Sequence, residues 1–300
     1  MIKMVQLRNG HGINSSLPLH NHCDVRKYAG FHINLILVFQ GIESGDTFLC
    51  ANSWSSALFS TSVGHGEMGE LVSHYAMTSI QKRLECHPDF DSNIEKALRE
   101  TFVQVDEDLE EQEHIEPLYS GTTACVVIMR RNTLYIANAG DSRAVLARKR
   151  NSDAKDAVPT NPTQCYTAIS LSVDQNPDSP GEMERIESCG GYVSLPLEPG
   201  LSARVWLDSD FTHIGLAMAR SIGDHALKSV GVISEPVITK HEIADNDEFI
   251  IIATDGVWVS WLPPYSFAFV NASGVWKPFL TSGSVFLCSK INAIGVHRFL

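Results

Sequence analysis

Three residues of the sequence stand where a fold could hold them for chemistry: Asp141, Asp255 and His65. Asp141 lies in the corner Gly140-Asp141-Ser142, where a glycine lets the backbone turn sharply. Asp255 comes directly after the segment 248–254, in which the fully apolar run 249–253 predicts a buried strand. A rigid sheet can aim a carboxylate from the end of a strand, so both aspartates are candidate functional residues.

The corner at Asp141 follows a pattern that predicts an antiparallel meander. Residues 124–129, 134–139 and 143–147 are β-branched-rich runs that are separated by short polar breaks. The first of them is apolar throughout, so we expect that strand to be covered on both faces. The alternative for the corner is that Asp141 and Ser142 only cap the turn.

His65 stands in the loop Gly64-His65-Gly66, between a short apolar run and a helical pattern that extends to Leu84. This order places an imidazole and free backbone groups at one loop. A second helix is predicted to begin at Ser92, and the acidic run 106–116 is interpreted as its solvated end.

Three later stretches carry weaker signals. Residues 179–180 predict the start of a short helix that ends at Gly190-Gly191, and residues 195–212 are interpreted as a surface insertion. In the Ala/Gly-rich segment 215–224, Arg220 and Asp224 are expected to form an internal ion pair.

The composition excludes several classes of protein. A net charge of −12 argues against a nucleic-acid binder and suits a protein that holds cations. The seven cysteines contain no CxxC pair, which predicts reduced thiols and an intracellular location, in the cytoplasm or nucleus. No signal peptide or apolar span of membrane length is visible, so no membrane partner is expected.

Acidic residues are unevenly distributed, and this sets the expected domain boundaries. The first 62 residues contain three of them, and none follows Asp255. We therefore predict a folded core over 63–258, a divergent N-terminal segment over 1–62 and a divergent C-terminal tail over 259–300.

Taken in order, the motifs resemble the metal-dependent protein serine/threonine phosphatases of type 2C (PPM). The resemblance implies an α+β fold in which two packed antiparallel β-sheets are flanked by helices, here with edge elements missing. The matching stretches are GHG at 64–66, SGTTA at 120–124, IANAGDSRAVL at 136–146, ERIESCGG at 184–191, LAMARSIGD at 216–224, EP at 235–236 and DEFIIIATDGVW at 247–258.

The same resemblance implies a site with two Mn²⁺ or Mg²⁺ ions, which activate water for attack on a phosphoserine or phosphothreonine. Gly64 matches the glycine whose carbonyl binds a metal, and Asp255 and Asp141 match metal-binding aspartates. His65 matches the proposed general acid. The expected partners are phosphoproteins, and we expect a monomer.

The sequence departs from the family pattern where the metal site needs charge. The residue before Gly64 is Val63 where the family has an aspartate that bridges the two ions. Val259 replaces a further aspartate, no later Asp-Asn pair follows, and the early acid and arginine of the family have no match around Asp24 and Arg26. These losses predict impaired activity. The alternatives are a pseudophosphatase that binds without turnover and a truncated or mis-joined gene product.

Overall fold

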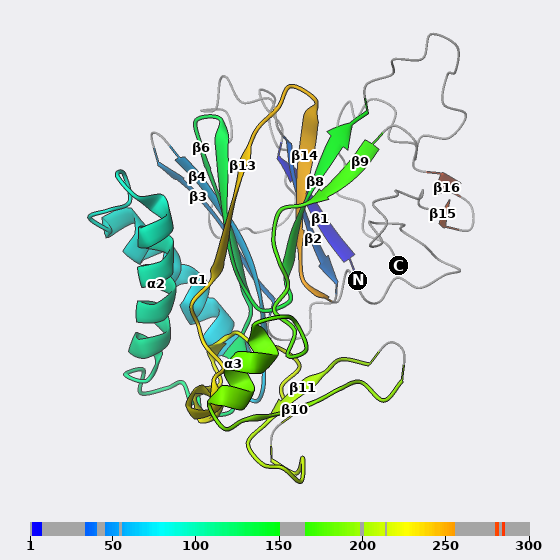
Figure 1. The fold of residues 1–300 in the computed structure, drawn as a ribbon. Helices are drawn as coiled ribbons and strands as arrows, with labels where there is room; N and C mark the ends of the chain where they lie inside the picture. Colours follow the sequence, from blue (N-terminus) through cyan, green and yellow to red (C-terminus); the bar gives the residue numbers. More distant parts are fainter. Residues whose placement is uncertain are drawn as a thin grey trace. The chain divides into compact units, whose positions relative to one another are not determined.

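The computed structural model describes residues 2–7, 34–40, 46–53, 56–150, 166–198, 201–213, 215–255, 280–281 and 284–285. The chain divides into two compact units (Figure 1). One comprises residues 1–41, 144–171 and 242–300, and the other comprises residues 42–143 and 172–241.

The first unit is built on a five-stranded sheet with the order β1-β2-β14-β8-β9. The pairs β1/β2 and β8/β9 are antiparallel, whereas β14 runs parallel to β2. Buried Ile250, Ile251 and Ile252 confirm the apolar strand that was predicted before Asp255. The strands are β1 (Ile2–Leu7), β2 (Asn34–Gln40), β8 (Arg143–Lys149), β9 (Tyr166–Ser170) and β14 (Asp247–Ala253), and a separate pair is formed by β15 (Leu280–Thr281) and β16 (Ser284–Val285).

The second unit is built on a sheet with the order β12-β5-β4-β6-β7-β13, with β3 paired to β4. Its centre is β6, which pairs antiparallel with β4 and with β7 and is buried over Ala124–Met129 as predicted. The strands are β3 (Asp46–Ser53), β4 (Ser56–His65), β5 (Gly121–Thr122), β6 (Ala124–Arg130), β7 (Thr133–Ala139), β12 (Ile222–Gly223) and β13 (Val237–Glu242).

The predicted three-stranded meander is wrong in its third member. β6 and β7 form a hairpin, with Arg130 opposite Thr133, but β8 pairs with β9 in the sheet of the first unit. The chain therefore leaves one sheet and enters another at the corner that contains Asp141. Strand pairing depends on contacts distant in sequence, which a local alternation of apolar residues does not specify.

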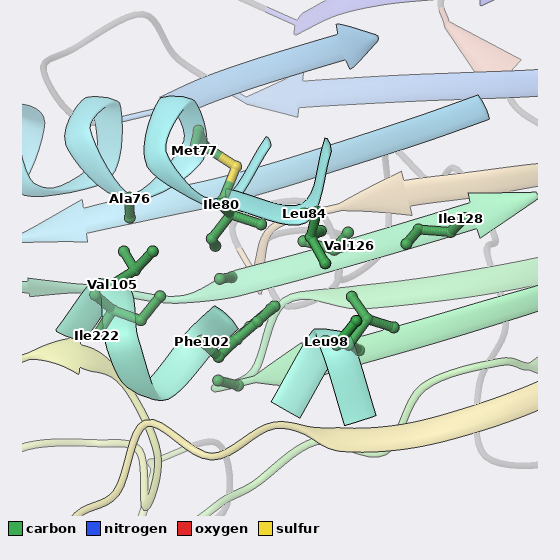
Figure 2. Packing of buried hydrophobic residues seen from close by; sticks show 14 of the residues in the cluster. Ala76, Met77, Ile80, Leu84, Leu98, Phe102, Val105, Val126, Ile128 and Ile222 are labelled. Carbon is green, nitrogen blue, oxygen red and sulfur yellow. The ribbon is translucent and has the colours of Figure 1, made fainter. Parts of the chain in front are cut away.

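Helices α1 (Gly69–Cys86) and α2 (Ile94–Leu109) pack beside each other on β4, β6 and β7 of the second unit (Figure 1). Their buried side chains and those of β6, β7 and β12 form one hydrophobic core cluster of this unit (Figure 2). The N-cap of α2 is Asn93, one residue after the predicted cap at Ser92. The side chain of Asn93 accepts a hydrogen bond from Lys96 N at 3.1 Å.

A third helix and a hairpin complete the second unit. α3 (Glu182–Ser188) is followed by Gly190 in the left-handed conformation (φ 86°), as predicted for its end. The expected surface insertion forms the hairpin of β10 (Tyr192–Ser194) and β11 (Arg204–Trp206), in which Leu197 is 95% exposed. No helix in the described parts of the chain is long and apolar enough to cross a bilayer.

Candidate functional site

The end of β4 carries the first predicted site residues. Gly64 pairs with Thr122 and His65 with Gly121 across the antiparallel ladder with β5. The chain then turns directly into α1, and a Cβ on Gly64 would lie 1.9 Å from the carbonyl oxygen of Gly69. Only glycine allows this close approach, so the residue type at position 64 is fixed by the turn itself.

His65 is held by a carboxylate that is far away in sequence. Its Nε2 lies 2.8 Å from both Oδ1 and Oδ2 of Asp224. Its Nδ1 is buried, and no described residue offers it a hydrogen-bond partner. Burial alone would lower the pKa of His65, but the hydrogen bond and charge of Asp224, together with the charge of Asp141, outweigh burial and raise this pKa above its ordinary value.

Asp224 is itself fixed by its own loop. It adopts the left-handed conformation (φ 53°, ψ 42°), its side chain is 5% exposed, and its Oδ2 accepts a hydrogen bond from Ser221 Oγ at 2.6 Å. The backbone N–H of Asp224 donates to the carbonyl of Ser120 at 2.9 Å. A strained conformation of this kind persists only where the surroundings determine it, and it is common at functional sites.

The predicted ion pair between Arg220 and Asp224 is wrong. Arg220 Nη2 lies 2.6 Å from Glu182 Oε1, and its Nη1 donates to the carbonyl of Glu235 at 2.7 Å. Asp224 is thereby free of this cation and serves His65 instead. The sequence pattern indicates Asp224, at the end of the segment 216–224, but not that its partner is His65.

Asp106 ties the loop of Asp224 to α2. It is 8% exposed, so its interpretation as part of a solvated helix end is wrong. One of its oxygens accepts hydrogen bonds from Gly223 N at 2.7 Å and His225 Nε2 at 3.2 Å, and the other lies 2.9 Å from Lys228 Nζ. A carboxylate buried among three donors is a strong anchor for the loop.

Asp141 lies in the same unit as Gly64 and His65. Around it, Gly140 is in the left-handed region (φ 105°) and donates its N–H to Gln175 Oε1 at 2.8 Å. Ser142 Oγ is 2.7 Å from Thr123 Oγ1, so Ser142 links two segments and does not cap the turn. Asp255 lies in the first unit, two residues after the end of β14.

The donor set around Gly64 does not fit a pair of bridged metal ions. Gly64 offers a carbonyl and Asp141 a carboxylate, but the side chain of Val63 has no lone pair. Two dications about 4 Å apart repel strongly unless anions lie between them. We therefore derive no chemical step through a metal at this site.

A second group of possible ligands lies apart from this site, at His87, Asp89 and Glu100. Lys96 already occupies its centre, because Lys96 Nζ lies 2.6 Å from Asp89 Oδ2 and 3.8 Å from Glu100 Oε1. This group is an exposed ion-pair network, and such networks are common on protein surfaces.

Replacing Gly121 with alanine is expected to destabilise the chain, because the new Cβ would lie 2.1 Å from Asp224 Oδ2. Forced overpacking of this kind costs about 1–3 kcal/mol in the free energy of unfolding. Chemical denaturation of Gly121→Ala, Asp224→Ala and the double variant measures the effect. If the clash is with the carboxylate, Gly121→Ala costs less in the Asp224→Ala background; equal costs in both backgrounds would contradict the assignment.

The fold, with helices packed on β-sheets and a His–Asp pair at a strand end, is that of an α+β protein. The profile of the family described as Protein phosphatase 2C matches residues 42–261. The chain belongs to this family.

Two plant relatives show how far the likeness extends. "Probable protein phosphatase 2C 72" of Arabidopsis thaliana is 34% identical over 262 residues, which are 82% of this chain and 72% of the relative. "Probable protein phosphatase 2C 75" of Oryza sativa subsp. japonica is 40% identical over 172 residues, 57% of this chain and 37% of the relative. The chain thus spans about a third of the length of some relatives that it matches.

A solved structure supports the fold. The serine-threonine phosphatase 2C from Toxoplasma gondii superposes with a TM-score of 0.61 at 18% identity, over 73% of this chain and 75% of that one. At this identity the likeness establishes the fold, and the expected fold class is confirmed.

Proposed function

We propose that the chain is a protein serine/threonine phosphatase of type 2C whose turnover is impaired. Its substrates would be phosphoserine and phosphothreonine in proteins, and its cofactor would be Mn²⁺ or Mg²⁺. The single observation that carries the proposed impairment is the aliphatic side chain of Val63. Val63 lies directly before Gly64 and His65, at the end of β4 that pairs with β5.

The physical reason for impairment is electrostatic. In a two-metal hydrolase the shared ligands offset the repulsion of the ions, and the bound water loses its proton near neutral pH. Gly64 and Asp141 still supply oxygen donors, so a single ion held weakly is compatible with this site. Asp255, in the stretch 247–258 that resembles the family, is also proposed as a metal ligand.

An assay of the purified chain on a phosphoserine peptide with Mn²⁺, beside Val63→Asp, tests the proposal. We expect turnover near background for the unchanged chain and little rescue by Val63→Asp alone, because Val259 also stands where the family has an aspartate. Robust turnover that depends on Mn²⁺ in the unchanged chain would contradict impairment. Full rescue by the single substitution would show that Val63 is the whole defect.

A second candidate function is a binding module that recognises phosphoproteins without hydrolysing them. It is favoured by the His65–Asp224 pair, which is fully formed in a site that lacks the bridging carboxylate. Calorimetric binding of the phosphoserine peptide without phosphate release would support this function. We also propose a location in the cytoplasm or nucleus, which the cysteine spacing in the sequence favours.

A further inference from the structure

We propose that Asp224 is a positioning residue for His65, which holds the imidazole through Nε2 and leaves Nδ1 as the nitrogen that meets the substrate. The inference rests on the proposed function, because it assigns the roles of the two ring nitrogens in the same site. It is carried by four features of the second unit.

The first feature is the geometry of the pair. Both carboxylate oxygens of Asp224 lie 2.8 Å from Nε2 of His65, so the ring cannot turn without losing two contacts. A charge-assisted hydrogen bond of this kind is short and strong. It fixes which nitrogen keeps its hydrogen, since a carboxylate can only accept.

The second feature is the state of the other nitrogen. Nδ1 of His65 is buried and has no partner among the described residues. Buried polar atoms without a partner are few in native proteins, and one explanation for them is a catalytic role. An oxygen of a bound phosphate ester would supply the missing contact.

The third feature is how completely the position of Asp224 is determined. Ser221 Oγ donates a hydrogen bond to Oδ2 of Asp224. The same carboxylate packs so closely against Gly121 that a Cβ there would lie 2.1 Å from Oδ2. The left-handed backbone at Asp224 is uncommon for a residue other than glycine. Together these features fix the position of the carboxylate.

The fourth feature is the anchoring of the loop to α2. Asp106 accepts a hydrogen bond from the N–H of Gly223, the residue before Asp224. Lys228 bridges Asp106 and the carbonyl of Ser221, at 2.9 Å and 2.8 Å. The loop that positions the imidazole is therefore fixed to α2.

The proton transfer that this arrangement allows is balanced within the site. The Nδ1–H bond of the imidazolium breaks, and its proton forms an O–H bond with the seryl or threonyl oxygen. The bond from that oxygen to phosphorus breaks as a water molecule takes the phosphoryl group. The electron pair of the broken bond remains on Nδ1. The ring is left neutral with its hydrogen on Nε2, where Asp224 still accepts the hydrogen bond. A proton donor held in a fixed position accelerates the reaction more than a mobile donor, because its geometry is established before the reaction.

Proton NMR of the full chain labelled with ¹⁵N-histidine tests the proposal at one fixed pH and needs no turnover. We expect an imidazole N–H signal far downfield of the backbone amides, on Nε2 and lost in His65→Gln. Asp224→Asn should abolish the signal or move it strongly upfield. Ser221→Ala, which keeps the carboxylate, should retain the signal with faster exchange. The matched control is Asp208→Asn, because Asp208 contacts His213 on the exposed hairpin at 3.5 Å and should leave the signal unchanged.

Addition of a phosphoserine peptide tests the role of Nδ1. We expect the ¹⁵N resonance of His65 Nδ1 to shift in the unchanged chain, with a loss of this shift in Asp224→Asn. Without peptide, a downfield hydrogen on Nδ1 in place of Nε2, or a signal that survives Asp224→Asn unchanged, would overturn the proposal. A peptide that binds and shifts Nε2 alone would overturn it too. A peptide that perturbs no resonance of the protein would instead contradict the proposed function, while the downfield signal still decides whether Asp224 holds the ring.

Discussion

Replacing Asp106 with asparagine is expected to lower the free energy of unfolding by about 3 kcal/mol at pH 7. The carboxylate is 8% exposed and receives donors from Gly223, His225 and Lys228. An amide of the same shape removes the negative charge and leaves the ammonium group of Lys228 without its buried partner. Breaking one side of a buried ion pair is costly for this reason.

The pH dependence of this effect has a definite sign. Burial would raise the pKa of Asp106, but the hydrogen bond from His225 and the charge of Lys228 outweigh it, so the pKa lies below its ordinary value. A carboxyl whose pKa is lower in the folded state stabilises the fold above its unfolded pKa, about 3.9, and this contribution is lost as the pH falls through the folded pKa. The difference in stability between the unchanged chain and Asp106→Asn should therefore shrink in acid.

Urea unfolding at pH 7 and at a series of pH values down to 3 measures both effects. His225 also faces Glu110, at 3.2 Å, so Glu110→Gln is a useful second variant that leaves Asp106 in place. Asp210→Asn is the exposed control, and it should change the free energy of unfolding far less. A loss for Asp106→Asn that is the same at every pH would mean that packing, and not charge, is what the side chain contributes.

The helices and the buried strands could be predicted from the sequence because each follows a local rule. The spacing of apolar residues predicted α1 and α2, and the unbroken apolar runs predicted β6 and β14. The partner of β8 could not be predicted in this way. Residues 143–147 form a mostly apolar run that suits either sheet, and only the pairing with β9 shows which sheet accepts the strand.

The same contrast between local patterns and contacts distant in sequence applies to the candidate site. Gly64, His65 and Asp141 could be selected because glycine and strand ends leave a local signal. The partner of His65 could not be selected in this way, since Asp224 lies 159 residues away and Arg220 nearby suggested an ion pair. The burial of Asp106 was hidden in the same way, because an aspartate in an acidic run has the appearance of a solvated residue until the loop of Gly223 covers it.

Truncation of Phe102 to alanine is expected to lower the free energy of unfolding of the second unit by about 3–5 kcal/mol. Phe102 is fully buried and lies in the layer between α2, α1 and β6, among Leu98, Val105 and Ile80 (Figure 2). Removing its ring takes away apolar contacts and leaves a cavity that the surrounding helices close only in part. Phe102→Leu keeps most of the volume and should cost about 1 kcal/mol.

Denaturant unfolding followed by circular dichroism, with Leu197→Ala as the exposed control, measures these differences. The control should stay within about 0.5 kcal/mol of the unchanged chain, because Leu197 is 95% exposed. Phe102 also lies one turn before Asp106 on α2, so a looser helix should weaken the anchor of the Asp224 loop. The downfield N–H signal of His65 should accordingly exchange faster in Phe102→Ala than in Phe102→Leu. Equal exchange in the two variants, despite a large difference in stability, would show that the pair is held by its own loop and not by the core beneath α2.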